Sequence, residues 1–243
     1  MTDQTRPILW TFRRCPYAIR ARLAIVSAGI GVELREIQLN NKPKPFLETS
    51  ASATVPALRI GEKVIDESLD IMVWALNQND PERLLEMPAS GWDLIQANDG
   101  PFKSALDHTK YAVRYPHLDE SAERNKAAEI LLKLDRQLGG QPWLFGDRPK
   151  LADLAISPFV RQFANTDRDW FDIQPWPALI AWLDRFLASD AFARVMMKYE
   201  PWSEGAVPVW FGVHSNVDTA VQLNRVDNSI NLSSNRAKNN PRF

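Results

Sequence analysis

The chain has 243 residues, which is enough for one large domain or two domains of ordinary size. Hydrophobic residues make up 45% of it and charged residues 24%, the balance of a globular protein, and the formal net charge is −1. This charge argues against nucleic acid or an anionic membrane as an obligate partner, because both require a basic surface. No run of 18 apolar residues occurs and residues 1–7 are polar, so we expect a cytoplasmic protein that does not enter a membrane.

The first predicted elements surround the only cysteine of the chain. Residues 8–10 are apolar and predict a strand. Pro16 suits the first position of a following helix, because its missing N–H would have no partner there. That helix carries apolar residues on one face, at Ile19, Leu23, Val26 and Ile30. Cys15 is therefore expected at a turn from strand to helix, as the N-cap.

Cys15 is a candidate reactive thiol because of this position. The unpaired N–H groups and the positive end of the helix dipole face an N-cap, and both lower the pKa of a thiol. Arg13 and Arg14 would lower it further if either guanidinium turned toward the sulfur. The alternative is a small buried hydrophobe, which is the usual role of a lone cysteine. One cysteine cannot form an internal disulfide, which fits a reducing compartment.

The rest of the N-terminal half alternates between strand and helix signals. Ser68 can cap a helix, because apolar residues follow it at helical spacing. The elements expected before it are a strand over residues 32–39, an irregular connection over 40–54 and a hairpin over 55–66 with a turn at Gly61-Glu62. The predicted order is βαβ followed by ββα.

Strand signals cease after a linker at residues 77–88. Helical spacing then recurs to about residue 199, and Gly100-Pro101 is expected to kink or split the first of these helices. From residue 212 asparagine is frequent and apolar residues are sparse, which indicates a mobile polar tail. The expected domains are an α/β domain at residues 6–80, an all-helical domain at 88–211 and the tail at 212–243.

This arrangement resembles the glutathione transferase family, over roughly residues 8–211. The resemblance implies an α/β thioredoxin-like N-terminal domain, an all-α helical-bundle C-terminal domain and a homodimer. The segments that look most like the omega class and its bacterial relatives are Cys15-Pro16-Tyr17-Ala18, Arg20-Ala21-Arg22-Leu23 and Asn41-Lys42-Pro43.

The resemblance also implies a role for each matching residue. Cys15 would form a mixed disulfide with glutathione, and Pro56 would be a cis proline. Val55 would pair its backbone with that of the tripeptide. The two ends of glutathione would be held by polar side chains, the γ-glutamyl end by Glu67 and Ser68 and the glycyl carboxylate by Lys42. Without the resemblance, these residues are a helix start, a solvated lysine and a strand residue.

A second-substrate site is expected between the two domains. Aromatic residues at helical spacing are also typical of a core, and the candidates are Trp10, Phe12, Phe102, Tyr111, Arg114 and Tyr115. Lys150 departs from the family pattern, because Ser or Thr normally caps the helix that contains Asp153. One capping hydrogen bond of about 1 kcal/mol is therefore expected to be missing.

The resemblance implies glutathione-dependent thiol transfer, with glutathione as co-substrate and a small apolar or disulfide substrate. Because Ala18 is not a second cysteine, glutathione itself must resolve a mixed disulfide on Cys15. Disulfides, glutathionyl adducts and dehydroascorbate-like electrophiles are the expected substrates. Two alternatives stay open, a conjugating transferase and a non-catalytic interaction module of the same fold. His108, His117 and His214 lack metal-ligand spacing, so no metal is expected.

Overall fold

The structure is a computed structural model in which residues 6–213 are described. The predicted polar tail falls on residues 214–243, apart from its first two positions, and so lies outside the described residues. Within residues 6–213, none of the helices combines the length and the apolar character that a bilayer span requires.

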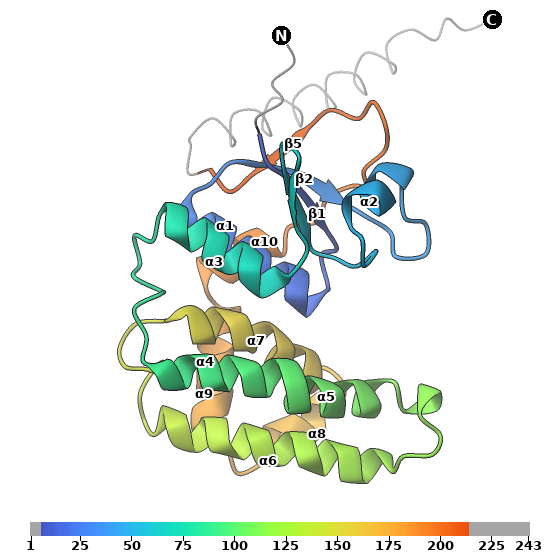
Figure 1. The fold of residues 1–243 in the computed structure, drawn as a ribbon. Helices are drawn as coiled ribbons and strands as arrows, with labels where there is room; N and C mark the ends of the chain where they lie inside the picture. Colours follow the sequence, from blue (N-terminus) through green and yellow to red (C-terminus); the bar gives the residue numbers. More distant parts are fainter. Residues whose placement is uncertain (1–5, 214–243) are drawn as a thin grey trace, which may run out of the picture. The chain divides into compact units, whose positions relative to one another are not determined.

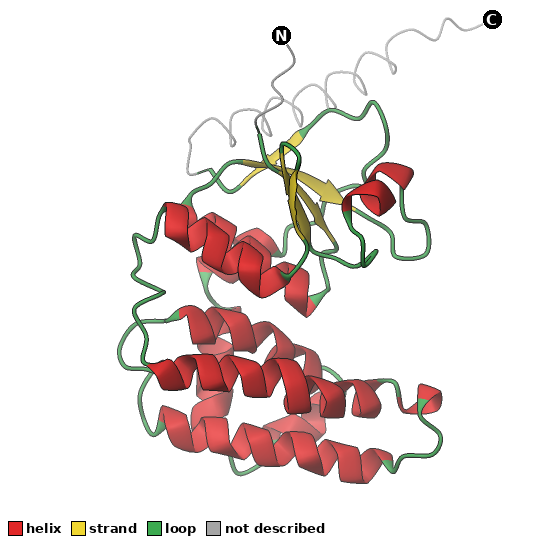
Figure 2. Ribbon diagram, in the orientation of Figure 1, coloured by secondary structure: helices red, strands yellow, loops and turns green. Residues whose placement is uncertain are grey.

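A five-stranded mixed sheet forms the centre of the N-terminal half (Figures 1 and 2). β1 is parallel to β2, the other neighbouring pairs are antiparallel, and the strand order is β4-β3-β1-β2-β5. The strands are β1 (Ile8–Thr11), β2 (Val32–Glu36), β3 (Ala57–Ile60), β4 (Lys63–Ile65) and β5 (Val209–Phe211).

Alternation along β1 gives the sheet two different faces. Leu9 packs with α1 (Pro16–Ala28) and α3 (Ser68–Gln78), and Trp10 packs on the other side against Phe46 of α2 (Lys44–Thr49). The sequence predicts an irregular connection where α2 lies. The short helix forms because its prolines occupy the N-cap and the first turn, where no N–H is required, and because Phe46 is buried.

The C-terminal half is a helical bundle, as the fold class predicts (Figure 2). Gly100-Pro101 interrupts its first helix with a single π-helical turn, which confirms the predicted break. The elements are α4 (Ala89–Ala97), η1 (Asn98–Phe102), α5 (Lys103–Lys110), η2 (Ala112–Arg114), α6 (Glu120–Leu138), α7 (Leu151–Ala164), α8 (Arg168–Asp172), α9 (Pro177–Leu187) and α10 (Asp190–Val195). α7 is the most buried of them, and α1 of the N-terminal half packs against it.

The segment after α10 is not helical, so the prediction of helix throughout residues 88–211 is wrong at its end. This segment returns to the sheet, where the Trp202 N–H donates to the carbonyl of Glu36 at 2.7 Å and β5 pairs with β2. Gly212 ends the strand with φ at +97°, and a Cβ there would lie 2.0 Å from the carbonyl oxygen of Ile30. A three-residue strand that pairs with residues about 175 positions earlier leaves little local pattern to detect.

Asp153 compensates for the lysine at the N-cap of α7. Its carboxylate accepts hydrogen bonds from the N–H of Lys150 at 2.8 Å, the N–H of Leu144 at 2.9 Å and Nε1 of Trp182 at 2.8 Å. The Lys150 side chain makes no cap and donates instead to the carbonyl of Arg83 at 2.9 Å. The expected capping bond is missing, and Asp153 satisfies the N–H groups around the helix start.

We predict that Asp153→Ala lowers the free energy of unfolding by about 3 kcal/mol, because it leaves buried N–H donors without acceptors. Chemical denaturation at pH 7 measures this change. Asp147→Ala, at an exposed position of the preceding turn, should change stability by less than about 0.5 kcal/mol. Equal effects of the two substitutions would contradict the assigned role of Asp153.

Candidate functional site

Cys15 lies at the N-cap of α1, where the sequence predicts it. Its residue is half-buried, and its Sγ lies 3.6 Å from the carbonyl oxygen of Val55. The Val55–Pro56 peptide bond is cis. The thiol therefore faces the segment that precedes β3, which is a backbone edge available to a peptide-like ligand.

The pKa of Cys15 does not follow the sequence prediction. Burial raises it above the ordinary value, although the backbone N–H groups of Ala18 and Tyr17 and the charges of Arg22 and Lys103 oppose this effect. The N-terminal amides of the helix act as expected, but desolvation of the thiolate is the larger effect. The expectation that Arg13 and Arg14 would lower this pKa is not met: Arg14 lies over the ring of Phe12, 5.7 Å from its centroid.

The loop that carries the thiol is held from both sides by residues that the sequence reasoning missed. Glu36 accepts the Arg13 N–H at 2.7 Å, and Arg22 donates to the Arg13 carbonyl at 2.8 Å. The buried Arg22 guanidinium also donates to the Thr11 hydroxyl and to the carbonyl of Val195 in α10 at 3.1 Å. Burial lowers the pKa of Arg22 to about 10, so it stays protonated at neutral pH.

Ser68 connects the site to the helical half. Its hydroxyl accepts a hydrogen bond from Nε of Arg20 at 3.0 Å, and the same guanidinium binds both carboxylate oxygens of Asp99 at 2.7 and 2.8 Å. Because the hydroxyl oxygen accepts from Arg20, its proton is free to be donated to a ligand carboxylate. The π-helical turn of η1 presents Asp99 to Arg20, and neither residue was predicted as part of the site.

Lys42 and Glu67, the two charged residues predicted to bind glutathione, lie on the same half of the molecule. The Lys42 ammonium donates to the carbonyl of Ala53 at 2.9 Å, two residues before Val55. Glu67 is the exposed N-cap of α3, next to the buried Ser68, and makes no side-chain capping bond. Both charges are therefore near the segments that present Val55 and Ser68.

The residues predicted for the second-substrate site lie in four different places. Phe102 is fully buried with its ring 5.7 Å from that of Phe163, so it is a core residue and not a ligand wall. Phe12 is half-buried and packs, as Cys15 does, against the buried cluster around Trp10. Trp10 is buried under α2. The other three lie at the end of α5, where the Arg114 guanidinium lies over the Tyr111 ring and Tyr115 contacts His108 edge to face.

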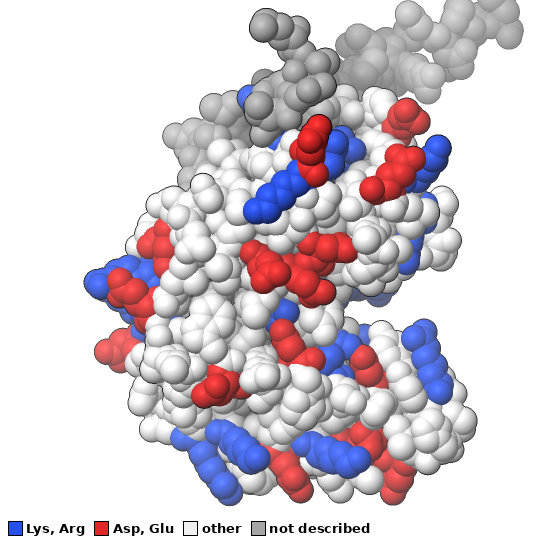
Figure 3. Space-filling view, viewed as in Figure 1, with Lys and Arg blue, Asp and Glu red and all other residues white. Residues whose placement is uncertain are grey.

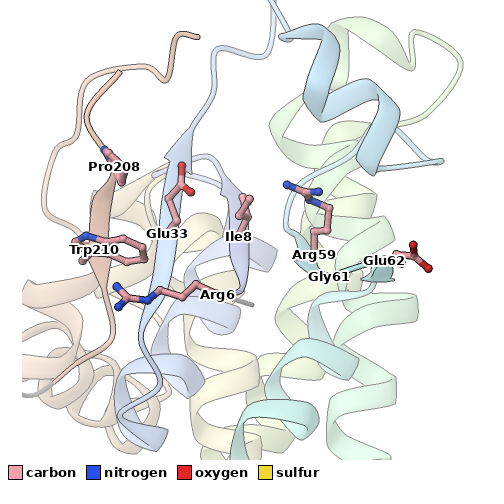
Figure 4. Close-up of a pocket in the computed structure, with 8 residues that line it drawn as sticks. All are labelled: Arg6, Ile8, Glu33, Arg59, Gly61, Glu62, Pro208 and Trp210. Atoms are coloured by element: carbon pink, nitrogen blue, oxygen red, sulfur yellow. The ribbon is translucent and has the colours of Figure 1, made fainter. Parts of the chain in front are cut away.

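The surface has a notch and, separately from it, a hollow. Figure 3 shows a notch between the sheet half and the helical half. A separate hollow of about 560 Å³ lies on the sheet and includes none of the predicted site residues (Figure 4). Its wall is formed by Trp210, with Arg6 stacked on the ring at 4.6 Å, and by Arg59 on the opposite side. Among the described residues, no group of three or more His, Cys, Asp or Glu is placed to hold a metal ion.

Two family models match this chain, one in its N-terminal half and one in its C-terminal half. "Glutathione S-transferase, N-terminal domain" matches residues 9–83, and "Glutathione S-transferase, C-terminal domain" matches residues 113–185. The chain belongs to the glutathione S-transferase family. This glutathione S-transferase therefore has the fold class that the sequence predicts.

Curated relatives and solved structures agree with this family. "Glutathione S-transferase U19" of Arabidopsis thaliana is 26% identical over 81% of this chain and 92% of its own length. "Glutathione S-transferase DHAR3, chloroplastic" of the same plant is 20% identical over 82% of this chain and 75% of its length. A glutathione transferase from Pseudomonas putida, solved with glutathione disulfide, has a TM-score of 0.69 at 18% identity and covers 81% of this chain and 93% of that one.

The position of the Cys15 pKa can be tested by alkylation. We predict that the rate of reaction with iodoacetamide rises with pH to a midpoint above roughly 8.5, the value of an unperturbed cysteine, because burial favours the neutral thiol. The midpoint, measured by intact mass between pH 6 and 10.5, reports ionisation of the Cys15 thiol and not steric access to it. A midpoint near pH 6 would contradict the dominance of burial.

The connection from Asp99 through Arg20 to Ser68 can be tested by glutathione affinity. Asp99→Asn should weaken binding about 10-fold in calorimetry, because Arg20 loses a charged bidentate partner and no longer fixes the Ser68 hydroxyl. Asp93→Asn removes the same charge at an exposed position of α4 and should have no effect. Equal affinities for Asp99→Asn and the unsubstituted protein would exclude the connection.

Proposed function

We propose that this glutathione S-transferase is a thiol transferase of the cysteine type, with Cys15 as the nucleophile. The observation that carries the proposal is the placement of the lone thiol at the N-terminus of α1, 3.6 Å from the Val55 carbonyl. A tripeptide aligned on the Val55 backbone would bring its own sulfur next to Sγ of Cys15. Together with Pro16, Tyr17 and Ala18, this cysteine supports an omega-like assignment within the family.

The remaining residues of the site support binding of glutathione. The Ser68 hydroxyl, with Arg20 as its donor, is arranged to donate to the γ-glutamyl carboxylate, and Glu67 lies beside it for the ammonium group. Lys42 is available to the glycyl carboxylate, since its present acceptor is an uncharged carbonyl group. A family member from Pseudomonas fluorescens was solved with two glutathione molecules bound, which supports a site with room for a glutathionyl substrate.

The proposed cycle is two thiol–disulfide exchanges. The Cys15 thiolate attacks the glutathione sulfur of a glutathionyl disulfide, forms the Cys15–glutathione disulfide and expels the other half as a thiolate. The thiolate of a second glutathione then attacks the glutathione sulfur on Cys15 and regenerates the Cys15 thiolate. In total the substrate is reduced to its thiol, and glutathione disulfide is released.

Conjugation of glutathione to an electrophile is the second candidate function. The raised pKa of Cys15 favours it, because a neutral thiol can donate a hydrogen bond to a glutathione thiolate instead of attacking. In that case the sulfur of glutathione is the nucleophile and no covalent bond to Cys15 forms. The two functions therefore differ in whether a mixed disulfide with the protein exists.

Intact mass spectrometry distinguishes the two functions. After incubation with glutathione disulfide, we predict a single glutathionyl adduct, because the structure holds one thiol in the site. Reduced glutathione should remove the adduct within the same experiment. The control is Cys15→Ser, which keeps a hydrogen-bond donor of similar size and should form no adduct.

The outcomes are separated by a parallel binding measurement. Absence of the adduct together with calorimetric binding of glutathione would favour conjugation, which is then tested with 1-chloro-2,4-dinitrobenzene. Absence of both adduct and binding would favour a non-catalytic module of the same fold.

A further inference from the structure

The turn over residues 50–53, which leads into Val55, is held by a carboxylate from another segment of the chain. The buried Ser50 hydroxyl donates to Oδ1 of Asp66 at 2.7 Å, and the Ser52 N–H donates to Oδ2 of the same carboxylate at 3.2 Å. Asp66 follows β4, whereas Ser50 and Ser52 follow α2, so these hydrogen bonds join residues 16 and 14 positions apart. Both oxygens of Asp66 therefore bind the turn.

Ser50 carries this constraint to the residue before Val55. Its carbonyl accepts the Ala53 N–H at 3.1 Å, which closes the turn, and its hydroxyl oxygen accepts the Thr54 N–H at 3.2 Å. A hydroxyl has one proton, and the Asp66 carboxylate at 2.7 Å is a stronger acceptor for it than the Thr54 carbonyl at 3.2 Å. Asp66 thus orients the hydroxyl group that holds the N–H of Thr54.

The backbone of Ala53 shows why the turn needs such support. Its φ is +53°, in the left-handed region that a residue with a Cβ adopts only at a cost. A conformation of this kind persists where the surroundings fix it. Here the Ala53 N–H binds the Ser50 carbonyl, and the Ala53 carbonyl accepts the Lys42 ammonium at 2.9 Å. A turn that relaxed at Ala53 would redirect the chain that enters Val55.

Val55 is the residue that the turn presents to Cys15. Its carbonyl oxygen lies 3.6 Å from Sγ of Cys15, and its N–H donates no hydrogen bond within residues 6–213. Val55 is 8% exposed, and a backbone N–H without an acceptor is unfavourable at such a place. A carbonyl group of a bound peptide would satisfy it. The position of this N–H depends on the peptide of Thr54, and therefore on the turn.

We infer that Asp66 is a positioning residue for glutathione, which acts through the turn over residues 50–53 on the backbone of Val55. This inference rests on the proposed function and adds a residue that the site described above does not include. Asp66 directly precedes Glu67 and Ser68, which are proposed to bind the γ-glutamyl end. Three consecutive residues would thus determine two parts of the tripeptide site, Asp66 through the turn and the other two by direct contact.

Asp66→Asn tests the inference, because asparagine keeps the size of the side chain but replaces one acceptor oxygen with a donor. In calorimetry with reduced glutathione, this variant should bind about 10-fold more weakly, and so should Ser50→Ala. The double variant should lose no more than the larger single loss, because both substitutions remove the same contact. Glu62→Gln removes the same charge at an exposed position of the hairpin turn and should bind as the unsubstituted protein does.

Ala53→Gly separates positioning of the turn from a general loss of structure. Glycine adopts a positive φ without steric cost, so in the Asp66→Asn background it should restore affinity about 3-fold. In the unsubstituted protein, where Asp66 already holds the turn, the gain should be smaller. Unchanged affinity in Asp66→Asn, or an equal effect of Ala53→Gly in the two backgrounds, would overturn the inference.

Failure of the proposed function gives a different result. The unsubstituted protein would then bind glutathione without forming a glutathionyl adduct on Cys15, and the affinities of the variants would still decide the role of Asp66.

Discussion

The site depends on the hydrogen bonds of the two buried arginines of α1. Arg20 extends to Ser68 and Asp99, and Arg22 to the Arg13 carbonyl and to Val195. Each guanidinium donates hydrogen bonds to groups from several segments of the chain. The start of α1 therefore cannot move independently of the sheet or of the helical half. A buried arginine needs such a set of acceptors, because its charge cannot be removed at neutral pH.

The helix between these contacts has little freedom to shift. α1 is buried along nearly its whole length and packs against α3, α7 and α10, with apolar residues of the sheet in the same core. The apolar residues of α1 are buried in the core, whereas the hydrogen bonds of the two arginines restrict the orientation of the helix. Hydrogen bonds depend on angle, and apolar contacts do not. The position of Cys15 at the end of α1 is therefore determined by contacts along the entire helix, and local turn geometry at Pro16 is only one part of it.

What could be predicted from sequence was local. The helix start at Cys15-Pro16, the break at Gly100-Pro101 and the hairpin turn at Gly61 each depend on neighbouring residues, and all appear in the structure. The contact of Arg22 with Val195 joins residues 173 positions apart, and that of Arg20 with Asp99 joins residues 79 apart. An arginine in a helix looks the same in sequence whether it is solvated or bound at such a distance.

The pKa of Cys15 shows the same limit of prediction from local sequence. The helix N-terminus is visible in the sequence, and its amides act on the thiol in the predicted direction, whereas the charges that lower the pKa are those of Arg22 and Lys103 and not those of Arg13 and Arg14. Burial of the thiol depends on packing by residues distant in the chain, so its larger opposing effect could not be read from the residues around Cys15. Local pattern thus gives the sign of the dipole effect but not the balance of charge against desolvation.

A raised thiol pKa is compatible with nucleophilic attack by Cys15. A thiolate becomes a stronger nucleophile as its pKa increases, so the small ionised fraction reacts faster per molecule. Arg22 and Lys103 oppose the effect of burial on the pKa of Cys15. The neutral thiol of the free protein is also protected from indiscriminate oxidation, because the thiolate is the reactive form.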